Sequence, residues 1–239
     1  MQSNHNIEKE KMYRSSGLYI LTFLMLFLCS FSVNGQDSPP VQPYKYDMRV
    51  NGLIPHPMSN NGFTGTFIGL FTFSGSINTQ LFDNFYAGVY YANSMFNVPT
   101  DKLVASNGYR ISTALQMNCM GLNLGHDYYF SSNGLLSTSI SLGEDYSKYN
   151  GIETITPVKI TDNYTAAFAN ATCSIIWLLE EHMGIGFQVD YTYVAHEFNP
   201  YDVALNQFKG YSGNDLKGNT SYLEFGFNVY LGIVKKKKK

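Results

Sequence analysis

The chain has 239 residues, a formal net charge of -2 and only 14% charged residues, against 15% aromatic ones. A nearly neutral chain gives no electrostatic reason to expect nucleic acid as a partner. So low a charge content also disfavours an ordinary soluble surface, which long charged side chains keep hydrated.

The first segment of the chain has the order of a secretory signal peptide. A positively charged lead precedes the apolar run GLYILTFLMLFLCSFSV, and small and polar residues follow it. We expect residues 1–35 to be a signal peptide cleaved after Gly35, with translation starting at Met1 or Met12. The alternative is an uncleaved membrane anchor, although the run is short for a spanning helix.

After a short lead at 36–43, the segment 44–234 alternates between apolar and polar residues. Period two is the period of extended strands, because successive side chains point to opposite sides. Short polar breaks at Asp83, Ser132 and Glu181 recur roughly every fifty residues, as hairpin turns would, and longer irregular breaks lie between them. The pattern predicts eight strands, with short turns at one end and long loops at the other.

The segment 109–130 departs from strict alternation. Its phase slips between Met117 and Leu122, where apolar residues fall on both faces. An extra residue in one strand would shift the phase in this way, so the pattern predicts a β-bulge.

The two faces of the predicted strands differ in character. One is apolar, whereas the other carries Ser, Gly, Asn and Gln, which suit a confined interior better than an open surface. In lipid, a closed barrel is the sheet that pairs all its backbone groups. We therefore predict an all-β fold, an eight-stranded antiparallel up-and-down transmembrane β-barrel with an apolar outside and a polar inside. The alternative is a soluble lipocalin-like carrier of an apolar ligand, in which the faces exchange roles.

Three strand segments, FYAGVYYANSMFNVP, LNLGHDYYF and MGIGFQVDYTY, resemble those of the small eight-stranded outer-membrane β-barrels of the OmpA/OmpX-like class, in particular the Bacteroidetes versions. The resemblance implies a location in the outer membrane of a Gram-negative cell, with outer-membrane lipid as a partner.

The last strand resembles the sorting signal that barrel assembly machinery recognises, a pattern of polar, glycine and two hydrophobic residues carried by Glu224, Gly226, Val229 and Leu231. The resemblance implies that machinery as a second partner. The chain departs from the usual ending because five lysines, 235–239, follow the strand. We expect this tail to be a solvated stop beyond the membrane.

Five charged residues fall on the predicted inner face: Lys45, Asp47, Arg49, Asp190 and Glu224. An isolated buried charge is costly, so these side chains are expected to pair. Because closure makes the first and last strands neighbours, Arg49 and Glu224 form the predicted pair. A narrow barrel is filled by its own side chains, so a structural plug is favoured over a gated ion path.

The external loops are the predicted place for an extracellular ligand. The last loop combines aromatic residues with Asn, Asp and Gly, a mixture that offers contact area and adaptable hydrogen bonding. An ordinary exposed loop is the alternative. The residues concerned are Phe198, Tyr201, Phe208 and Tyr211.

Nothing in the sequence supports catalysis or a metal site. The histidines at 56, 126, 182 and 196 stand in neither a His-x-x-x-His nor a Gly-x-Ser-x-Gly motif. We expect no catalytic residue and no cofactor, with a lipid-modifying outer-membrane enzyme as the alternative. Cys119 and Cys173 fall on non-neighbouring predicted strands and are expected to remain free thiols.

Overall fold

A computed structural model describes residues 44–82, 84–98, 111–153, 159–180, 182–198 and 218–233. All of them belong to one compact unit, Pro40–Lys239. The expected signal peptide, the lysine tail, and Tyr201, Phe208 and Tyr211 of the last loop lie outside the described residues.

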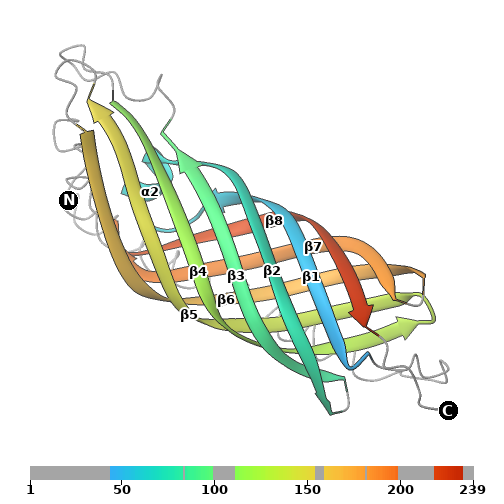
Figure 1. The fold of residues 1–239 in the computed structure, drawn as a ribbon. Helices are drawn as coiled ribbons and strands as arrows, with labels where there is room; N and C mark the ends of the chain where they lie inside the picture. Colours follow the sequence, from blue (N-terminus) through green and yellow to red (C-terminus); the bar gives the residue numbers. More distant parts are fainter. Residues whose placement is uncertain are drawn as a thin grey trace, which may run out of the picture. The chain divides into compact units, whose positions relative to one another are not determined.

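Eight antiparallel strands close into a single barrel in which each strand pairs with its neighbours in sequence and β1 pairs with β8 (Figure 1). The prediction of an eight-stranded up-and-down barrel is confirmed. The elements are β1 (Tyr46–Pro57), α2 (Asn61–Thr66), β2 (Ile68–Phe82), β3 (Phe85–Asn97), β4 (Ile111–Ser131), β5 (Gly134–Glu153), β6 (Lys159–Glu180), β7 (Met183–Glu197) and β8 (Asn219–Ile233).

The stagger of the barrel follows from the strand register. A path that passes from each residue to its cross-strand partner goes once around the barrel. It starts at Ile175 of β6 and returns to β6 at Thr165, a shift of 175 − 165 = 10 residues. The partners along the path are Phe187, Phe227, Gly52, Phe73, Asn93, Asn118 and Tyr146. Ten residues of rise over eight strand spacings tilt the strands by roughly 40° and advance the chain about 2.5 Å along the barrel axis per residue.

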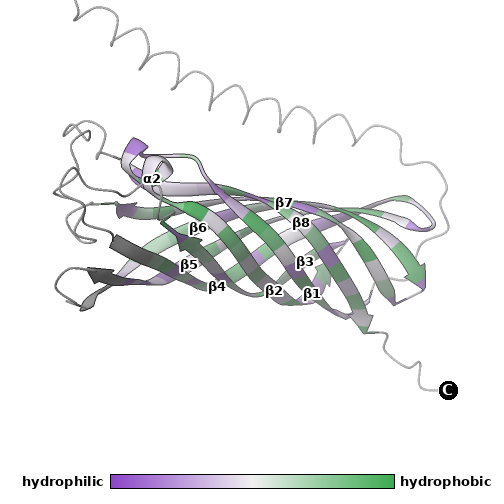
Figure 2. Cartoon of the chain, turned by 90° about the horizontal axis from the view of Figure 1, so that it is seen from above, coloured by the Kyte–Doolittle hydropathy of each residue, from purple (hydrophilic) through white to green (hydrophobic). Residues whose placement is uncertain are grey.

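Side chains alternate strictly between lumen and exterior. Along β7 and β8 the odd residues of the central stretch, such as Phe187 and Phe227, are exposed, while Gln188 and Asn228 are buried. Hydrophobic and hydrophilic bands accordingly alternate along the strands in Figure 2. Large apolar residues covering the outside and polar residues filling the inside are the arrangement of a membrane-spanning barrel.

The predicted bulge in β4 is absent. The ladders of β4 with β3 and with β5 run without a shift through the whole suspected stretch. Leu115, Met117 and Cys119 are buried in the lumen, whereas Met120 and Leu122 face outward. The lumen itself becomes apolar toward one end, and this change of content imitated a change of phase.

The two ends of the barrel differ as predicted. Short turns join β2 to β3, β4 to β5 and β6 to β7 at one end, which we call the short-turn end. The other connections meet at the opposite, long-loop end. There Asn60 caps α2, because its side chain accepts hydrogen bonds from the backbone N–H groups of Gly62 and Phe63. Within the described residues, no helix has the length and apolarity needed to cross a membrane.

A charged lumen sealed by aromatic side chains

Arg49 lies at the centre of a buried charge cluster. Its guanidinium makes ion pairs with Asp47 on its own strand and Asp127 on β4, each at 2.9 Å. It also donates hydrogen bonds to Tyr86 at 2.9 Å and to Ser137, and it stacks over the Tyr86 ring at 4.2 Å. Planar bidentate pairing and stacking are the strengths of arginine, so this side chain ties β1, β3, β4 and β5 together.

The predicted partner of Arg49 was wrong. Strands β1 and β8 are neighbours, but Arg49 lies opposite Tyr230, and Glu224 lies opposite Pro55, six residues away along β1. Lys45 was also assigned wrongly to the lumen, because it precedes β1 and is exposed, with its ammonium 5.1 Å from the Tyr46 ring. Asp47, Arg49, Asp190 and Glu224 are buried inside as predicted.

Three residues of the lumen chemistry were missed from the sequence. Asp127, the second carboxylate of Arg49, and Tyr86 both lie on the inner face. Asp145 on β5 is fully buried and accepts a hydrogen bond from Ser147 at 2.6 Å. The supposed phase slip concealed Asp127, since the assumed bulge left the orientation of the second half of β4 undecided.

Amide and hydroxyl side chains extend the network along the lumen. Asn78 donates to Asp47 at 2.8 Å and accepts from Asn123, which in turn accepts from Ser141. Across the closing seam, Asn228 of β8 donates to Asn51 of β1, and it also donates to Gln188 of β7. Each bond joins different strands, so these side chains hold the barrel closed while they fill it.

The short-turn end of the lumen is sealed by a small apolar layer. Tyr44 and Tyr230 pack edge to face at 6.2 Å between ring centroids. Leu135, Ile176 and Leu178 complete the cluster, and Tyr129 packs against it.

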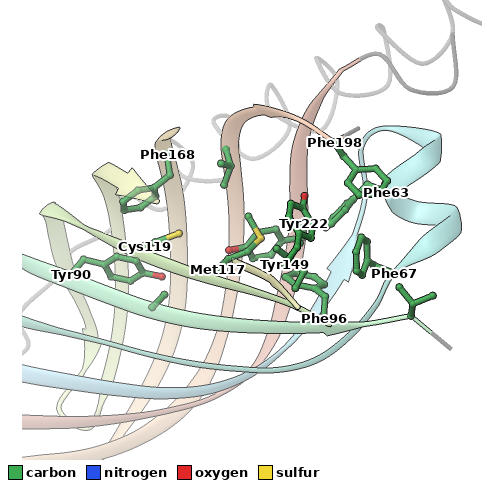
Figure 3. Packing of buried hydrophobic residues seen from close by; sticks show 14 residues of the cluster. Phe63, Phe67, Tyr90, Phe96, Met117, Cys119, Tyr149, Phe168, Phe198 and Tyr222 are labelled. Carbon is green, nitrogen blue, oxygen red and sulfur yellow. The ribbon is translucent and has the colours of Figure 1, made fainter. Parts of the chain in front are cut away.

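The long-loop end is sealed by an aromatic cap (Figure 3). Phe63 of α2 lies within 6.0 Å, centroid to centroid, of Phe67, Phe96 and Phe198. Below them Tyr149 and Tyr222 continue the cluster into the barrel. The connection between β1 and β2 thus folds back over the barrel mouth and closes it with side chains.

Phe198 therefore does not serve the role predicted for it. It is completely buried in the aromatic cap and cannot contact an external ligand. Its apolar ring, directly after β7, packs against Phe63 of α2, a contact that the sequence of the loop alone does not reveal.

Buried side chains of the described strands fill the lumen. Two polar cavities of about 10 Å³ each, the space of one water molecule, lie among these side chains. One is lined by Asp47, Tyr86 and Asp127 and the other by Arg49, Tyr90 and Gln188. Together with the apolar exterior, this filling contradicts the lipocalin-like alternative.

The histidines form no metal site within the part of the chain that the structure describes, where no three His, Cys, Asp or Glu side chains cluster. His126 contacts the Phe85 ring and His196 stacks on Tyr164, with centroids 4.6 Å and 3.5 Å apart. Cys119 and Cys173 are free thiols.

The pattern of the last strand coincides with the two faces of β8. Glu224 and Gly226 lie in the inward phase, and Val229 and Leu231 face outward. Gly226 passes so close to β1 that a Cβ there would lie 2.0 Å from the carbonyl oxygen of Gly52. The glycine of the pattern thus has a structural role at the closing seam of the barrel.

Three strands continue beyond the apolar exterior at the long-loop end. On β5 the outward residues change from Ile140 and Leu142 to Glu144, Tyr146 and Lys148. From Glu144 to the end of β5 at Glu153 the strand extends roughly 20 Å further along the axis. With β4 and β6 it forms what we call the arm, made of residues 111–118, 144–153 and 159–167 (Figure 1).

The outer edge of the arm has no strand partner over the described residues, although the ring of His196 on β7 stacks on Tyr164 within it. β6 pairs with β7 from Phe168 onward, whereas Lys159–Ala167 pair with β5 alone. A strand edge of this kind presents unpaired backbone donors and acceptors to the surroundings.

Comparisons with known proteins find similarity of structure only. No family model and no curated protein matches the chain. Among solved structures, Neisserial surface protein A superposes with a TM-score of 0.50 at 9% identity, covering 79% of this chain and 97% of its own.

Two further matches are Ail of Yersinia pestis and a major outer membrane protein of Thermus thermophilus. Their TM-scores are 0.45 and 0.48 at 8% and 6% identity, with 79% and 78% of this chain covered and 99% of each of theirs. At such low identity the likeness concerns the fold alone. The chain has the fold of a small outer-membrane β-barrel protein.

Proposed function

We propose that this protein is a non-conducting, non-enzymatic outer-membrane barrel that binds an extracellular polypeptide through the open edge of its arm. The observation that carries the proposal is the stretch Lys159–Ala167 of β6, which lies beyond the apolar exterior and, among the described residues, has β5 as its single strand partner. The sealed lumen supports the absence of conduction, since ion pairs fill its middle and aromatic layers close both ends.

An extended peptide is the partner that such an edge fits best. Main-chain hydrogen bonds from an added strand satisfy the free donors and acceptors, and alternate side chains provide specificity. The outward residue Thr165 beside this edge is exposed and can hydrogen-bond to a bound chain. The arm is thus the binding element of this proposal, whereas Tyr201, Phe208 and Tyr211 of the last loop lie outside the described residues.

Lipid and the barrel assembly machinery are the other partners in this proposal. The outward apolar side chains support lipid contact. The pattern of Glu224, Gly226, Val229 and Leu231 supports recognition of β8 by the assembly machinery, with a signal peptide at residues 1–35 for export. The lysine tail at 235–239 remains a proposed solvated stop.

Two neighbouring proline variants test the open edge. In an antiparallel ladder, consecutive N–H groups point to opposite sides of a strand. Of Thr165→Pro and Ala166→Pro, one therefore removes a donor from the open edge and the other removes a donor from the β5 side. Both residues lie in the arm. Thr165 is exposed, whereas Ala166 packs against the aromatic cap. Neither residue belongs to the membrane-spanning part of the barrel, so both variants should still fold into a barrel whose gel mobility changes on boiling.

The probe is a displayed library of extended peptides, selected on the wild-type barrel in lipid nanodiscs. We expect the selected peptides to lose at least tenfold in affinity for the edge variant. The variant on the β5 side loses arm protection in hydrogen exchange instead. Peptides that bind both variants as tightly as the wild type, or a selection that yields no binder, would refute binding at this edge.

A further inference from the structure

A second carboxyl pair lies in the lumen apart from the arginine cluster. Asp190 on β7 and Glu224 on β8 are direct cross-strand partners, and both are completely buried. Directly opposed residues in an antiparallel pair have Cβ atoms about 4.5–5.5 Å apart. The two acids therefore face the lumen side by side.

Hydrogen bonding satisfies only half of each carboxyl group. Asp190 Oδ2 accepts from Gln188 Nε2 at 2.9 Å, and Glu224 Oε2 accepts from Thr192 Oγ1 at 3.2 Å. Asp190 Oδ1 and Glu224 Oε1 are buried without a hydrogen-bond partner among the described residues. An unsatisfied buried acceptor costs free energy, and here two of them belong to one cross-strand pair.

No basic side chain compensates this pair in the described part of the chain. Arg49 is occupied by Asp47 and Asp127, and Lys45 and Lys148 are exposed. The titratable groups that interact with the pair are Tyr90 of β3, Cys119 of β4, Cys173 of β6 and Tyr222 of β8, none of which is a cation. Two unscreened negative charges at this distance would repel strongly in a closed lumen.

We propose that Asp190 Oδ1 and Glu224 Oε1 are bridged by one bound cation, either a proton or a metal ion. One bridging cation satisfies both unpartnered oxygens at once. A proton turns one group into an acid that donates to the other, and the remaining negative charge is held by the Thr192 hydroxyl and the Gln188 amide. A hard metal ion would instead take these carboxylate oxygens as ligands.

Both sources link the stability of the barrel to the cation. The unfolded chain exposes its carboxyl groups to water and releases the bridge, so the folded state binds one more cation than the unfolded state. If the cation is a proton, stability falls as pH rises, and the unfolding equilibrium constant increases tenfold per pH unit. If it is a metal ion, a chelator lowers stability at constant pH.

Infrared spectroscopy and elemental analysis of the whole folded protein distinguish the two sources. A proton bridge gives a carboxylic-acid carbonyl band at neutral pH that is absent from Glu224→Gln. A metal bridge gives one equivalent of metal that survives gel filtration and is lost from Glu224→Gln. Wild-type protein with neither a carboxylic-acid band at neutral pH nor a stoichiometric metal would overturn the proposal, and this outcome requires no variant.

Unfolding at several pH values adds a matched comparison. Glu224→Gln supplies an amide donor in place of the bridge. If the bridge is a proton, the tenfold rise of the unfolding equilibrium constant per pH unit that it causes in the wild type is absent from this variant. Ser141→Ala removes a buried hydroxyl that bonds to Asn123, away from the pair, and should keep the wild-type slope. Asp145 is present in all three proteins and cancels in the comparison. Equal slopes for wild type and Glu224→Gln contradict the proton bridge.

Discussion

Replacing Arg49 by methionine tests whether the charge cluster stabilises the barrel. The substitution keeps an unbranched, flexible side chain but removes the guanidinium that pairs with both Asp47 and Asp127 at 2.9 Å. Both carboxylates then remain buried without a cation. Breaking a buried pair by removing one partner typically costs about 3–5 kcal/mol, most of which is the cost of the charge left behind.

The origin of that cost gives a sharper test than its size. If unpaired charge causes the loss, neutralising the carboxylates restores stability. Arg49→Met combined with Asp47→Asn and Asp127→Asn should recover at least half of the lost free energy of unfolding. The double variant that carries Asp47→Asn and Asp127→Asn but keeps Arg49 should be destabilised, because it leaves the guanidinium unpaired.

Urea unfolding in lipid vesicles, followed by the emission of Trp177, measures these changes. The chain has one tryptophan, and this side chain is 48% exposed on the outside of β6, away from the cluster. A loss below about 1 kcal/mol for Arg49→Met would refute the reasoning, since a buried pair costs more to break. So would a triple variant no more stable than the single one.

Three further variants test the closing seam between β1 and β8, the apolar exterior and the aromatic cap. In Gly226→Ala the new Cβ would lie 2.0 Å from the Gly52 carbonyl oxygen, so the variant should lose at least about 1–3 kcal/mol of unfolding free energy. In Gly52→Ala the nearest atom to the new Cβ is 3.8 Å away, so this control should fold normally. The temperature at which half of the protein shifts on a gel compares the two variants. Leu124 is 61% exposed near the middle of the apolar exterior, so Leu124→Arg should lose about 2–4 kcal/mol of unfolding free energy in lipid vesicles. The control Lys148→Glu, on the arm, should leave the urea midpoint of unfolding unchanged. Phe63→Ala should cost about 3–5 kcal/mol yet stay silent in planar bilayers, because the Arg49 cluster still blocks the lumen; a stable conductance would show that the cap alone closes it.

Alternation along the strands was enough to predict the barrel and its two faces. Each strand is half lipid-facing, so the period of two is present in the residues themselves, from Ile185 to Tyr193 for example. The alternation misled where the lumen becomes apolar, since Leu115 and Met117 belong to the aromatic cap, not to the lipid face. It also misled at Lys45, which precedes β1 and is exposed.

Side-chain partners could not be predicted in the same way. Which carboxylate meets Arg49 depends on the register around a barrel staggered by ten residues, and the sequence does not fix that register. The burial of Phe198 depends on α2 folding over the barrel mouth, a contact across more than 100 residues of chain. The open edge of the arm required both the unequal strand lengths and the register, so no single segment revealed it.

Quenching of Trp177 by brominated lipid tests the central claim most directly. The barrel places this side chain on the lipid-facing exterior of β6, while the neighbouring Ile176 and Leu178 lie in the lumen. In vesicles of lipids brominated along the acyl chain, emission should therefore be strongly quenched, and aqueous acrylamide should quench it little. Emission that acrylamide quenches and brominated lipid does not would place Trp177 in water and contradict the assignment of an apolar, membrane-embedded exterior.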